Sequence, residues 1–239
     1  MNTKQDEISA AGNTNKLIRK VWWSYLLWVL AAAILGFIVP AVFAGFLRLP
    51  RNVYLIPYIV LIGALIYSYL RWSHINIGES IRYHWPWGVA GGILAGFFAS
   101  RTVLIQPSSP TPQGLELLFY LLWLGIAYGA MDAMFLSVLP LSATWKAFSA
   151  LGWTKRWGGR IASGVLALLA SLLIIAVYHL GYPECRGPQV GLIVVGVGIQ
   201  SLIMLLAGNP MVVIIGHIAM HITAVLHGIN SVSQLPPHY

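Results

Sequence analysis

The chain has 239 residues, of which 58% are hydrophobic and only 8% are charged, and its mean hydropathy is +0.77. A soluble domain usually carries about a quarter charged residues, so this composition excludes a water-soluble globular protein and predicts an integral membrane protein. The net charge of +8 is therefore ascribed to membrane topology, and we expect the lipid bilayer rather than nucleic acid as partner. One cysteine, Cys185, excludes an intrachain disulfide and a multi-cysteine metal site.

The predicted elements are transmembrane helices, each needing about 20 mostly apolar residues. Residues 1–20 are polar and are expected to form a cytoplasmic tail. The apolar run over 21–47 exceeds the roughly 7–15 residues of a signal-peptide core, so we interpret it as a retained span. Within a membrane domain over 21–229, the spans are predicted at 21–47, 53–70, 85–105, 115–145, 160–182, 189–208 and 210–228, followed by a tail over 230–239. The predicted fold is an all-α, polytopic membrane helix bundle of about seven transmembrane helices.

The orientation of this multi-pass protein is predicted from its basic residues, which favour the cytoplasmic side. With the N-terminus inside, ten of the 14 Lys and Arg residues fall on the cytoplasmic side and four on the other. Two Gly-x-x-x-Gly motifs, Gly92 to Gly96 and Gly125 to Gly129, offer places for close helix contact. The frequency of glycine in membrane helices explains them equally well.

Ionisable residues inside spans cost roughly 2.5–3.5 kcal/mol each on insertion scales, so each needs a partner or a function. Of the six acidic residues, only Asp132 lies in the middle of a predicted span. His179 closes the fifth span, and His217 and His221 lie in the last one, four residues apart and therefore on one helix face. His227 points elsewhere and is expected to be a bystander. A single buried histidine often only donates to a backbone carbonyl, but a pair with a lone aspartate favours a polar site.

In chain order, these residues form a pattern that resembles the CPBP family of intramembrane proteases, which includes prenyl-protein (CAAX) endopeptidases and bacteriocin self-immunity proteins. The family pattern is Glu-Glu-x-x-x-Arg, then Phe-x-x-x-His, then His-x-x-x-Asn. Here the corresponding segments are "MDAMFL" (131–136), "IAVYH" (175–179) and "HIAMH" (217–221). The resemblance covers roughly residues 115–228.

The sequence departs from the family pattern at five positions. Asp132 replaces the second glutamate, His221 replaces the asparagine, and the remaining changes are Met131, Leu136 and Ile175. The surviving groups are one carboxylate and three imidazoles.

The resemblance implies a peptidase mechanism. Asp132 and His179 would activate a water molecule for attack on a peptide carbonyl, and His217 and His221 would stabilise the oxyanion or bind a metal. One carboxylate and up to three imidazoles also suit Zn²⁺ with an open position for water, so Asp132, His179, His217 and His221 are the predicted catalytic residues and the possible zinc ligands. The substrate would be a membrane-embedded or lipidated peptide.

Two other functions are compatible with the same residues. The chain could be an inactive relative that binds a partner protein or a lipid-linked peptide in the same cavity, as a membrane-binding or immunity protein would, because the family's Glu and Arg are missing. It could also be a proton-coupled carrier that uses Asp132 and the histidines as a relay.

Overall fold

The computed structural model describes residues 3–187 and 189–236, and every regular element in these ranges is helical. Six helices are long and apolar enough to cross a membrane, and a seventh, shorter one is also apolar. The predicted fold class, an all-α membrane helix bundle, is therefore confirmed, and the chain is a multi-pass membrane protein.

The helices follow one another with short connections. In chain order they are α1 (Thr3–Val39), η1 (Pro40–Phe46), α2 (Arg51–Ser73), α3 (Ile77–Arg82), α4 (Trp85–Leu104), α5 (Gly114–Tyr120), η2 (Leu121–Tyr128), α6 (Gly129–Ala133), η3 (Met134–Val138), α7 (Leu139–Ala150), η4 (Trp153–Lys155), α8 (Trp157–Gly181), η5 (Pro183–Cys185), α9 (Gln189–Ala207) and α10 (Met211–His227). The elements η1, η2 and η3 are π-helical, and η4 and η5 are 3₁₀ turns.

The first and the last of the apolar helices depart in length from a simple membrane span. Helix α1 begins at Thr3, inside the segment predicted as a polar tail, so the first apolar span is the second part of a longer helix. Helix α10 has 17 residues, about 25 Å at 1.5 Å per residue, against a hydrocarbon core of about 30 Å. The last helix is thus the shortest of the seven apolar helices.

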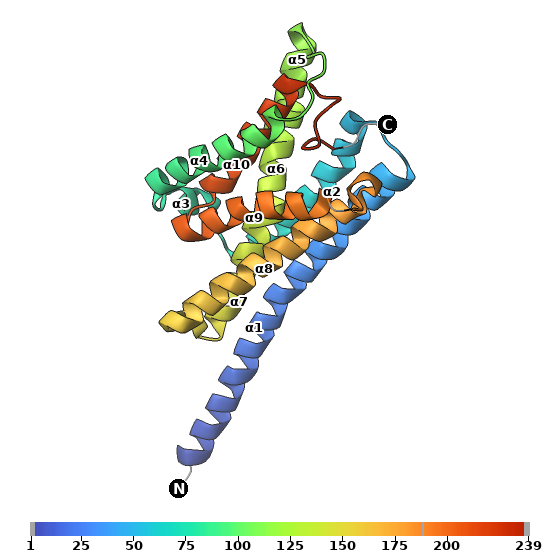
Figure 1. Cartoon of the computed structure of the whole chain (residues 1–239). Helices are drawn as coiled ribbons and strands as arrows, with labels where there is room; N and C mark the ends of the chain where they lie inside the picture. The colour runs from blue at the N-terminus through green and yellow to red at the C-terminus, as the bar shows by residue number, and fades with distance from the viewer. Residues whose placement is uncertain (1–2, 188, 237–239) are drawn as a thin grey trace.

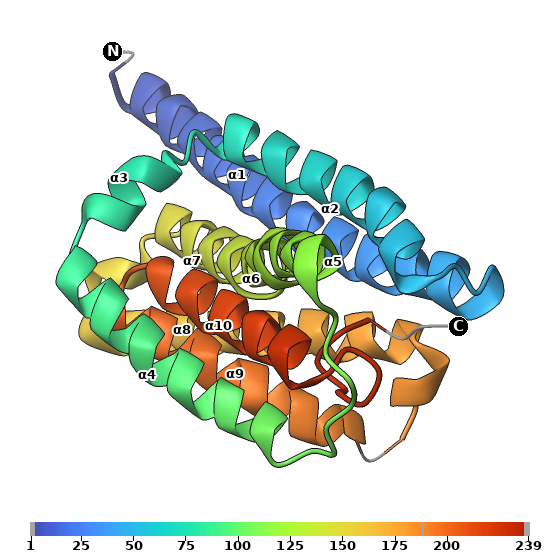
Figure 2. The same ribbon diagram turned by 90° about the horizontal axis from the view of Figure 1, so that it is seen from above.

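The helix order in space puts one segment at the centre. Figure 2 shows α5, α6 and α7 running through the middle of the molecule, with α1 and α2 on one side and α10 and α4 on the other. Helix α10 packs most extensively on α4 and also contacts η2 and α6. Helix α8 packs against α1, α7 and α9, and Figure 1 shows α1 and α8 side by side.

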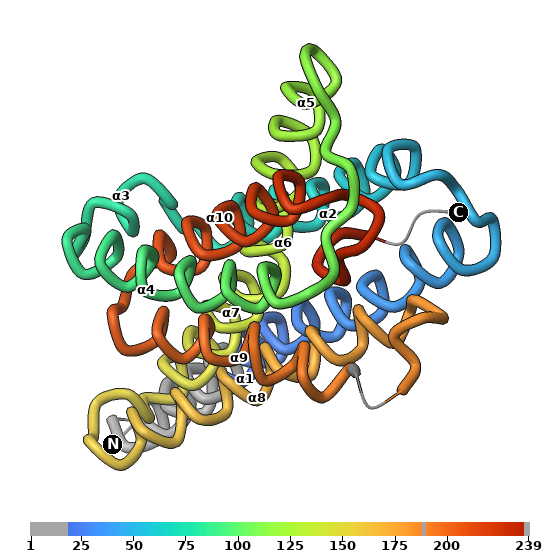
Figure 3. The backbone as a smooth tube through the Cα atoms, turned by 45° about the horizontal axis from the view of Figure 1, so that its top comes forward, coloured from blue at the N-terminus to red at the C-terminus, as the bar shows by residue number. Residues whose placement is uncertain are grey.

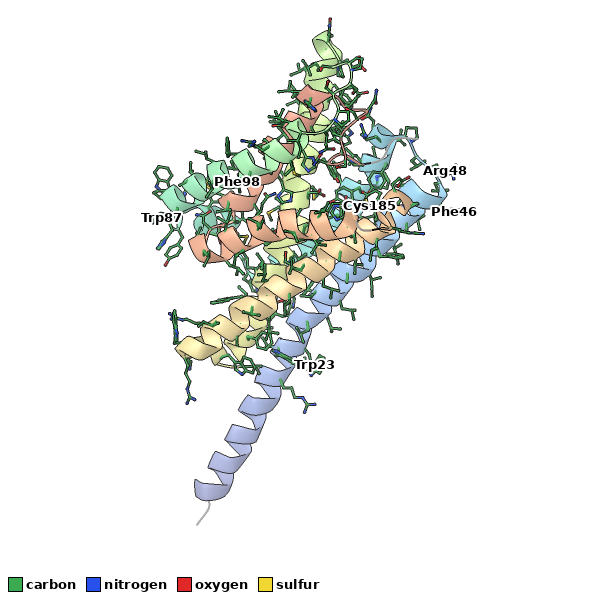
Figure 4. All side chains as sticks on the ribbon, in the orientation of Figure 1. Trp23, Phe46, Arg48, Trp87, Phe98 and Cys185 are labelled. Atoms are coloured by element: carbon green, nitrogen blue, oxygen red, sulfur yellow. The ribbon has the colours of Figure 1, made fainter. Side chains whose placement is uncertain are left out.

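Apolar side chains cover the outside of the bundle, and polar ones lie inside it. Trp23, Phe46, Trp87 and Phe98 are all at least half exposed and project outward in Figure 4. The buried polar residues lie on the inner faces of the helices; they include Asp132, Ser137, Thr144, Ser163, Ser171, Gln200, Ser201, His217 and His221. This arrangement suits a protein whose surface faces lipid and whose polar groups bond to one another.

The segment after α10 folds back onto the bundle. Figure 3 shows it beside the segment that links α4 to α5. Gln106 bonds to Gln234 (2.8 Å), and the guanidinium of Arg51 donates to the carbonyl oxygens of Ile229 and Pro236. Residues 230–236, predicted as part of a tail, are therefore packed against α2 and the α4–α5 connection, while 237–239 lie outside the described residues.

Candidate active site

Asp132 lies on a short α-helical stretch between two π-helical ones. Helix α6 has five residues, with η2 before it and η3 after it. π-Helical turns are rare and occur often at functional sites, because each one rotates the following side chains and leaves carbonyl groups without their usual partners. Asp132 is 4% exposed and is therefore buried in the core.

A proline explains part of this irregular geometry. Pro140, at the start of α7, has no N–H to donate to the carbonyl of Leu136 four residues earlier. That carbonyl accepts a hydrogen bond from the Ser171 hydroxyl of α8 instead (2.7 Å). A buried backbone group freed by proline is thus satisfied by a side chain from a neighbouring helix, as the membrane interior requires.

Glycines bring α10 against the site. A Cβ added to Gly129 would lie 3.0 Å from the Ile218 Cα and 3.1 Å from the His221 Cδ2, and one added to Gly125 would lie 2.9 Å from Ile222. On the other side of α10, added Cβ atoms at Gly92 and Gly96 would lie 2.8 Å and 2.9 Å from its side chains. Both Gly-x-x-x-Gly motifs therefore contact α10, which carries His217 and His221.

The carboxylate of Asp132 contacts side chains from two other helices. Its Oδ1 accepts a hydrogen bond from the Tyr58 hydroxyl of α2 (2.5 Å). Its Oδ2 lies 3.6 Å from Nε2 of His221, which is within ion-pair distance for a protonated ring but longer than an ordinary hydrogen bond. Residues from three separate helices therefore meet at this carboxylate.

The tautomers of two histidines follow from their hydrogen bonds. Nδ1 of His217 lies 3.0 Å from the carbonyl oxygen of Val213, and Nδ1 of His179 lies 2.8 Å from that of Ile175. A carbonyl oxygen only accepts, so Nδ1 carries the proton in both rings, and in the neutral form Nε2 presents a lone pair. Neutral His217 is thus a proton acceptor, and the oxyanion-donor role that the family resemblance implies would require it to be protonated.

Several imidazole nitrogens have no hydrogen-bond partner among the described residues. They are Nε2 of His217 and both ring nitrogens of His221, although these two side chains are 0% and 1% exposed. Leaving a polar group buried without a partner costs about 1–3 kcal/mol. Such atoms normally have a function or a ligand.

Of the four predicted residues, the structure brings Asp132 and His221 into direct contact. The rings of His217 and His221 lie 6.3 Å apart between centroids, one helical turn apart on α10. The half-buried His179 packs against Tyr178 and Tyr182, with ring centroids 4.9 Å and 6.5 Å away, and interacts electrostatically with Asp132 and His221. His227 bonds to the carbonyl oxygen of Gln106 (2.8 Å), outside the site as expected.

The geometry of these side chains does not form the predicted zinc site. In the described part of the chain, no group of three or more His, Cys, Asp or Glu side chains is arranged so that it could hold a metal ion. Asp132, His179, His217 and His221 therefore do not fit a common metal shell.

A tyrosine cluster that the sequence pattern does not predict adjoins the carboxylate. Its five members, all at most 3% exposed, are Tyr54, Tyr58, Tyr128, Tyr178 and Tyr182. The signal was present in the sequence as pairs four residues apart: Tyr54 with Tyr58, Tyr178 with Tyr182, and Tyr128 with Asp132. Tyrosine is common at membrane interfaces, which hid these pairs among other aromatic residues.

No family model matches the chain, and neither a curated protein nor a solved structure matches it.

Proposed function

We propose that this protein is an intramembrane endopeptidase in which Asp132 and His221 form the acid–base pair. The observation that carries the proposal is the contact of 3.6 Å between Asp132 Oδ2 and His221 Nε2, together with the unpartnered Nδ1 on the other side of the same buried ring. A carboxylate behind an imidazole with a free second nitrogen is the arrangement of a general base.

In the proposed mechanism, His221 directs its Nε2–H at Asp132 and uses the Nδ1 lone pair as the base. As the oxygen of water attacks the carbonyl carbon of a peptide bond, Nδ1 takes one proton from that water. The carboxylate stabilises the resulting imidazolium, which returns the proton to the departing amine when the C–N bond breaks. The Nε2 lone pair of His217 accepts a hydrogen bond from the attacking water and orients it. His179, with its own Nε2 lone pair, is a second proton acceptor at the edge of the site.

The resemblance to CPBP proteases supports the same function, with one change of role. In that pattern the Asp132 position works with His179, whereas the geometry favours His221 as its immediate partner. The substrate class remains a membrane-embedded or lipidated peptide.

The test is peptide cleavage by purified full-length protein in proteoliposomes, with fluorescence-quenched peptides that span the bilayer or carry a prenyl group. Asp132→Asn and His221→Gln should each lower kcat/KM by about 10²–10⁴-fold, the usual contribution of general acid–base catalysis. His227→Gln is the matched control, because this histidine lies on the same helix but bonds to a loop carbonyl. Cleavage that does not depend on Asp132, His179 or His221 would refute the enzyme proposal.

A specific observation favours the second candidate, an inactive relative that binds a membrane partner. The Tyr58 hydroxyl already occupies one carboxylate oxygen of Asp132, and Met131 and Leu136 stand where the family has Glu and Arg. The same assay separates the two proposals, because the second one expects peptides to bind, by fluorescence anisotropy, without being cut by the wild-type protein.

We also propose that the N-terminus is cytoplasmic, because ten of the 14 basic residues then face the cytoplasm. Fluorescent-protein fusions at the N-terminus and after His227 should report opposite sides of the membrane if seven helices cross it. A fluorescent N-terminal fusion on the outside would contradict this orientation.

A further inference from the structure

The segment that follows α10, residues 228–236, covers one end of the bundle without forming a helix. Its residues Val232 and Leu235 are 7% and 4% exposed, and both belong to the same apolar core cluster as Tyr54 and Tyr128. The segment is therefore part of the packed core at this end of the molecule.

Side chains of the bundle bind the main chain of this segment. The Arg51 guanidinium donates to two of its carbonyl oxygens. The side-chain oxygens of Gln106 and Ser109 each accept a hydrogen bond from one of its N–H groups (2.9 Å and 3.2 Å). These contacts satisfy main-chain groups that have no helix or strand to satisfy them. The groups bound in this way belong to Ile229 and Pro236, to Ser233, and to Asn230.

Gly228 lets the chain turn back at the end of α10. Its φ is +129°, a conformation that side chains other than glycine rarely adopt. An added Cβ would lie 2.3 Å from the Ser109 hydroxyl oxygen and 2.5 Å from the Ser109 nitrogen. The close contact between the segment and the α4–α5 connection thus requires glycine at this position.

The segment lies about two helical turns from the contact between Asp132 and His221. Arg51, which binds it, precedes Tyr58 by seven residues on α2, or about 10 Å at 1.5 Å per residue, and Tyr58 donates to Asp132. Tyr128, a member of the core cluster that the segment joins, has its ring centroid 4.7 Å from that of His221. The segment therefore covers the end of the bundle next to the candidate site.

We infer that residues 228–236 form a releasable plug, which closes this end of the bundle and limits the access of water and small solutes to His221. Segments with few buried apolar side chains, and with main-chain bonds that water can replace, open at a lower free energy than core helices do. Helices α2 and α10 stay in place when the plug leaves, because their main-chain hydrogen bonds lie within each helix. The inference is independent of peptide hydrolysis, since it concerns access to the site whether or not a substrate is cut.

The test is the modification of histidines by diethyl pyrocarbonate in full-length protein in nanodiscs, with the modified residues identified by mass spectrometry. Leu235→Asp places a charge in the apolar core cluster, where its burial is costly, so the plug should stay released. The modification rate of His221 should then rise about tenfold or more, the shift that losing the burial of one leucine produces. Ser233→Asp is the matched control, because it adds the same charge to the same segment at an exposed residue. The exposed His84 reports the activity of the reagent in every sample.

A faster reaction of His221 in Leu235→Asp, with the wild-type rate in Ser233→Asp, supports the plug. Equal His221 rates in all three proteins, relative to His84, would overturn it. If Leu235→Asp does not fold, Gln106→Ala removes the side chain that bonds to Ser233 and Gln234 and should speed the reaction in the same way. Thermal unfolding shows that each variant is folded at the temperature of the assay. Because no peptide is cut in this assay, its failure leaves the peptidase proposal unaffected, and the reverse also holds.

Discussion

Asp132 and His221 approach each other to 3.6 Å because Gly129, one helical turn before Asp132, has no side chain. The backbone of α10 lies directly over this glycine, so that even one methyl group there would be 3.0 Å from the Ile218 Cα. The bundle therefore depends on a small residue at Gly129 for the contact that defines the site.

Gly129→Ala should accordingly push α10 away from α6. We expect a loss of about 1–3 kcal/mol in the free energy of unfolding, as is typical of overpacking, together with loss of the proposed peptidase activity. Thermal unfolding in detergent measures the first effect. Gly196→Ala on α9 is the control, since a Cβ at Gly196 meets nothing within 4 Å; equal stability of the two variants would contradict the proposed packing role.

Tyr58→Phe should destabilise the protein by about 1–3 kcal/mol, because it removes the hydrogen bond to a buried carboxylate and leaves Oδ1 of Asp132 without that donor. Tyr69→Phe should cost less, because its partner Ser142 keeps its bonds to the carbonyls of Val138 and Leu139. Denaturation of both variants in the same detergent provides the comparison. A smaller loss for Tyr58→Phe than for Tyr69→Phe would show that Asp132 does not depend on this donor.

Ser171→Ala should lower the free energy of unfolding by about 1–2 kcal/mol. Pro140 has no N–H for the Leu136 carbonyl, so this carbonyl would lose the hydrogen bond that the Ser171 hydroxyl donates to it. Ser163→Ala is a matched control on the same helix, as its equally buried hydroxyl bonds only to the Gly159 carbonyl one turn earlier.

A double-mutant cycle gives a sharper form of this prediction. Pro140→Ala restores an N–H for the Leu136 carbonyl. In that background Ser171→Ala should therefore lower the free energy of unfolding by less, with an interaction energy between the two changes of at least about 0.5 kcal/mol. Additive effects of the two changes would contradict the conclusion that the Ser171 hydroxyl replaces the N–H that Pro140 lacks.

Cys185 should react slowly with thiol reagents in the folded protein. Burial raises the pKa of the Cys185 thiol, and the negative charge of Glu184 raises it further. Because the thiolate is the reactive form, alkylation at neutral pH should be slower than in detergent-denatured protein and should accelerate as the pH rises. Glu184→Gln lowers this pKa and should increase the rate at a fixed pH; equal rates in folded and denatured protein would refute the prediction.

The amino-acid sequence by itself determined the fold class and the approximate positions of the helices. A bilayer requires long apolar helices whatever their neighbours are, so the run over 53–70 is sufficient to predict α2 without any tertiary information. The spacing of His217 and His221 likewise placed both on one helix face, and the isolation of Asp132 among apolar residues identified it as the carboxylate of the candidate site.

Only the tertiary structure decided which of these groups meet. The family resemblance pairs Asp132 with His179, yet the carboxylate faces His221 and Tyr58, because glycines let α10 approach closely and a five-residue α-helical stretch between two π-helical ones sets the direction of Asp132. The tyrosine cluster joins residues from α2, η2, α8 and the turn that follows α8. Hydropathy reports only how favourably each residue transfers into lipid. Contacts between side chains of different helices depend on how the helices are rotated and staggered, and side-chain packing across the whole bundle determines both.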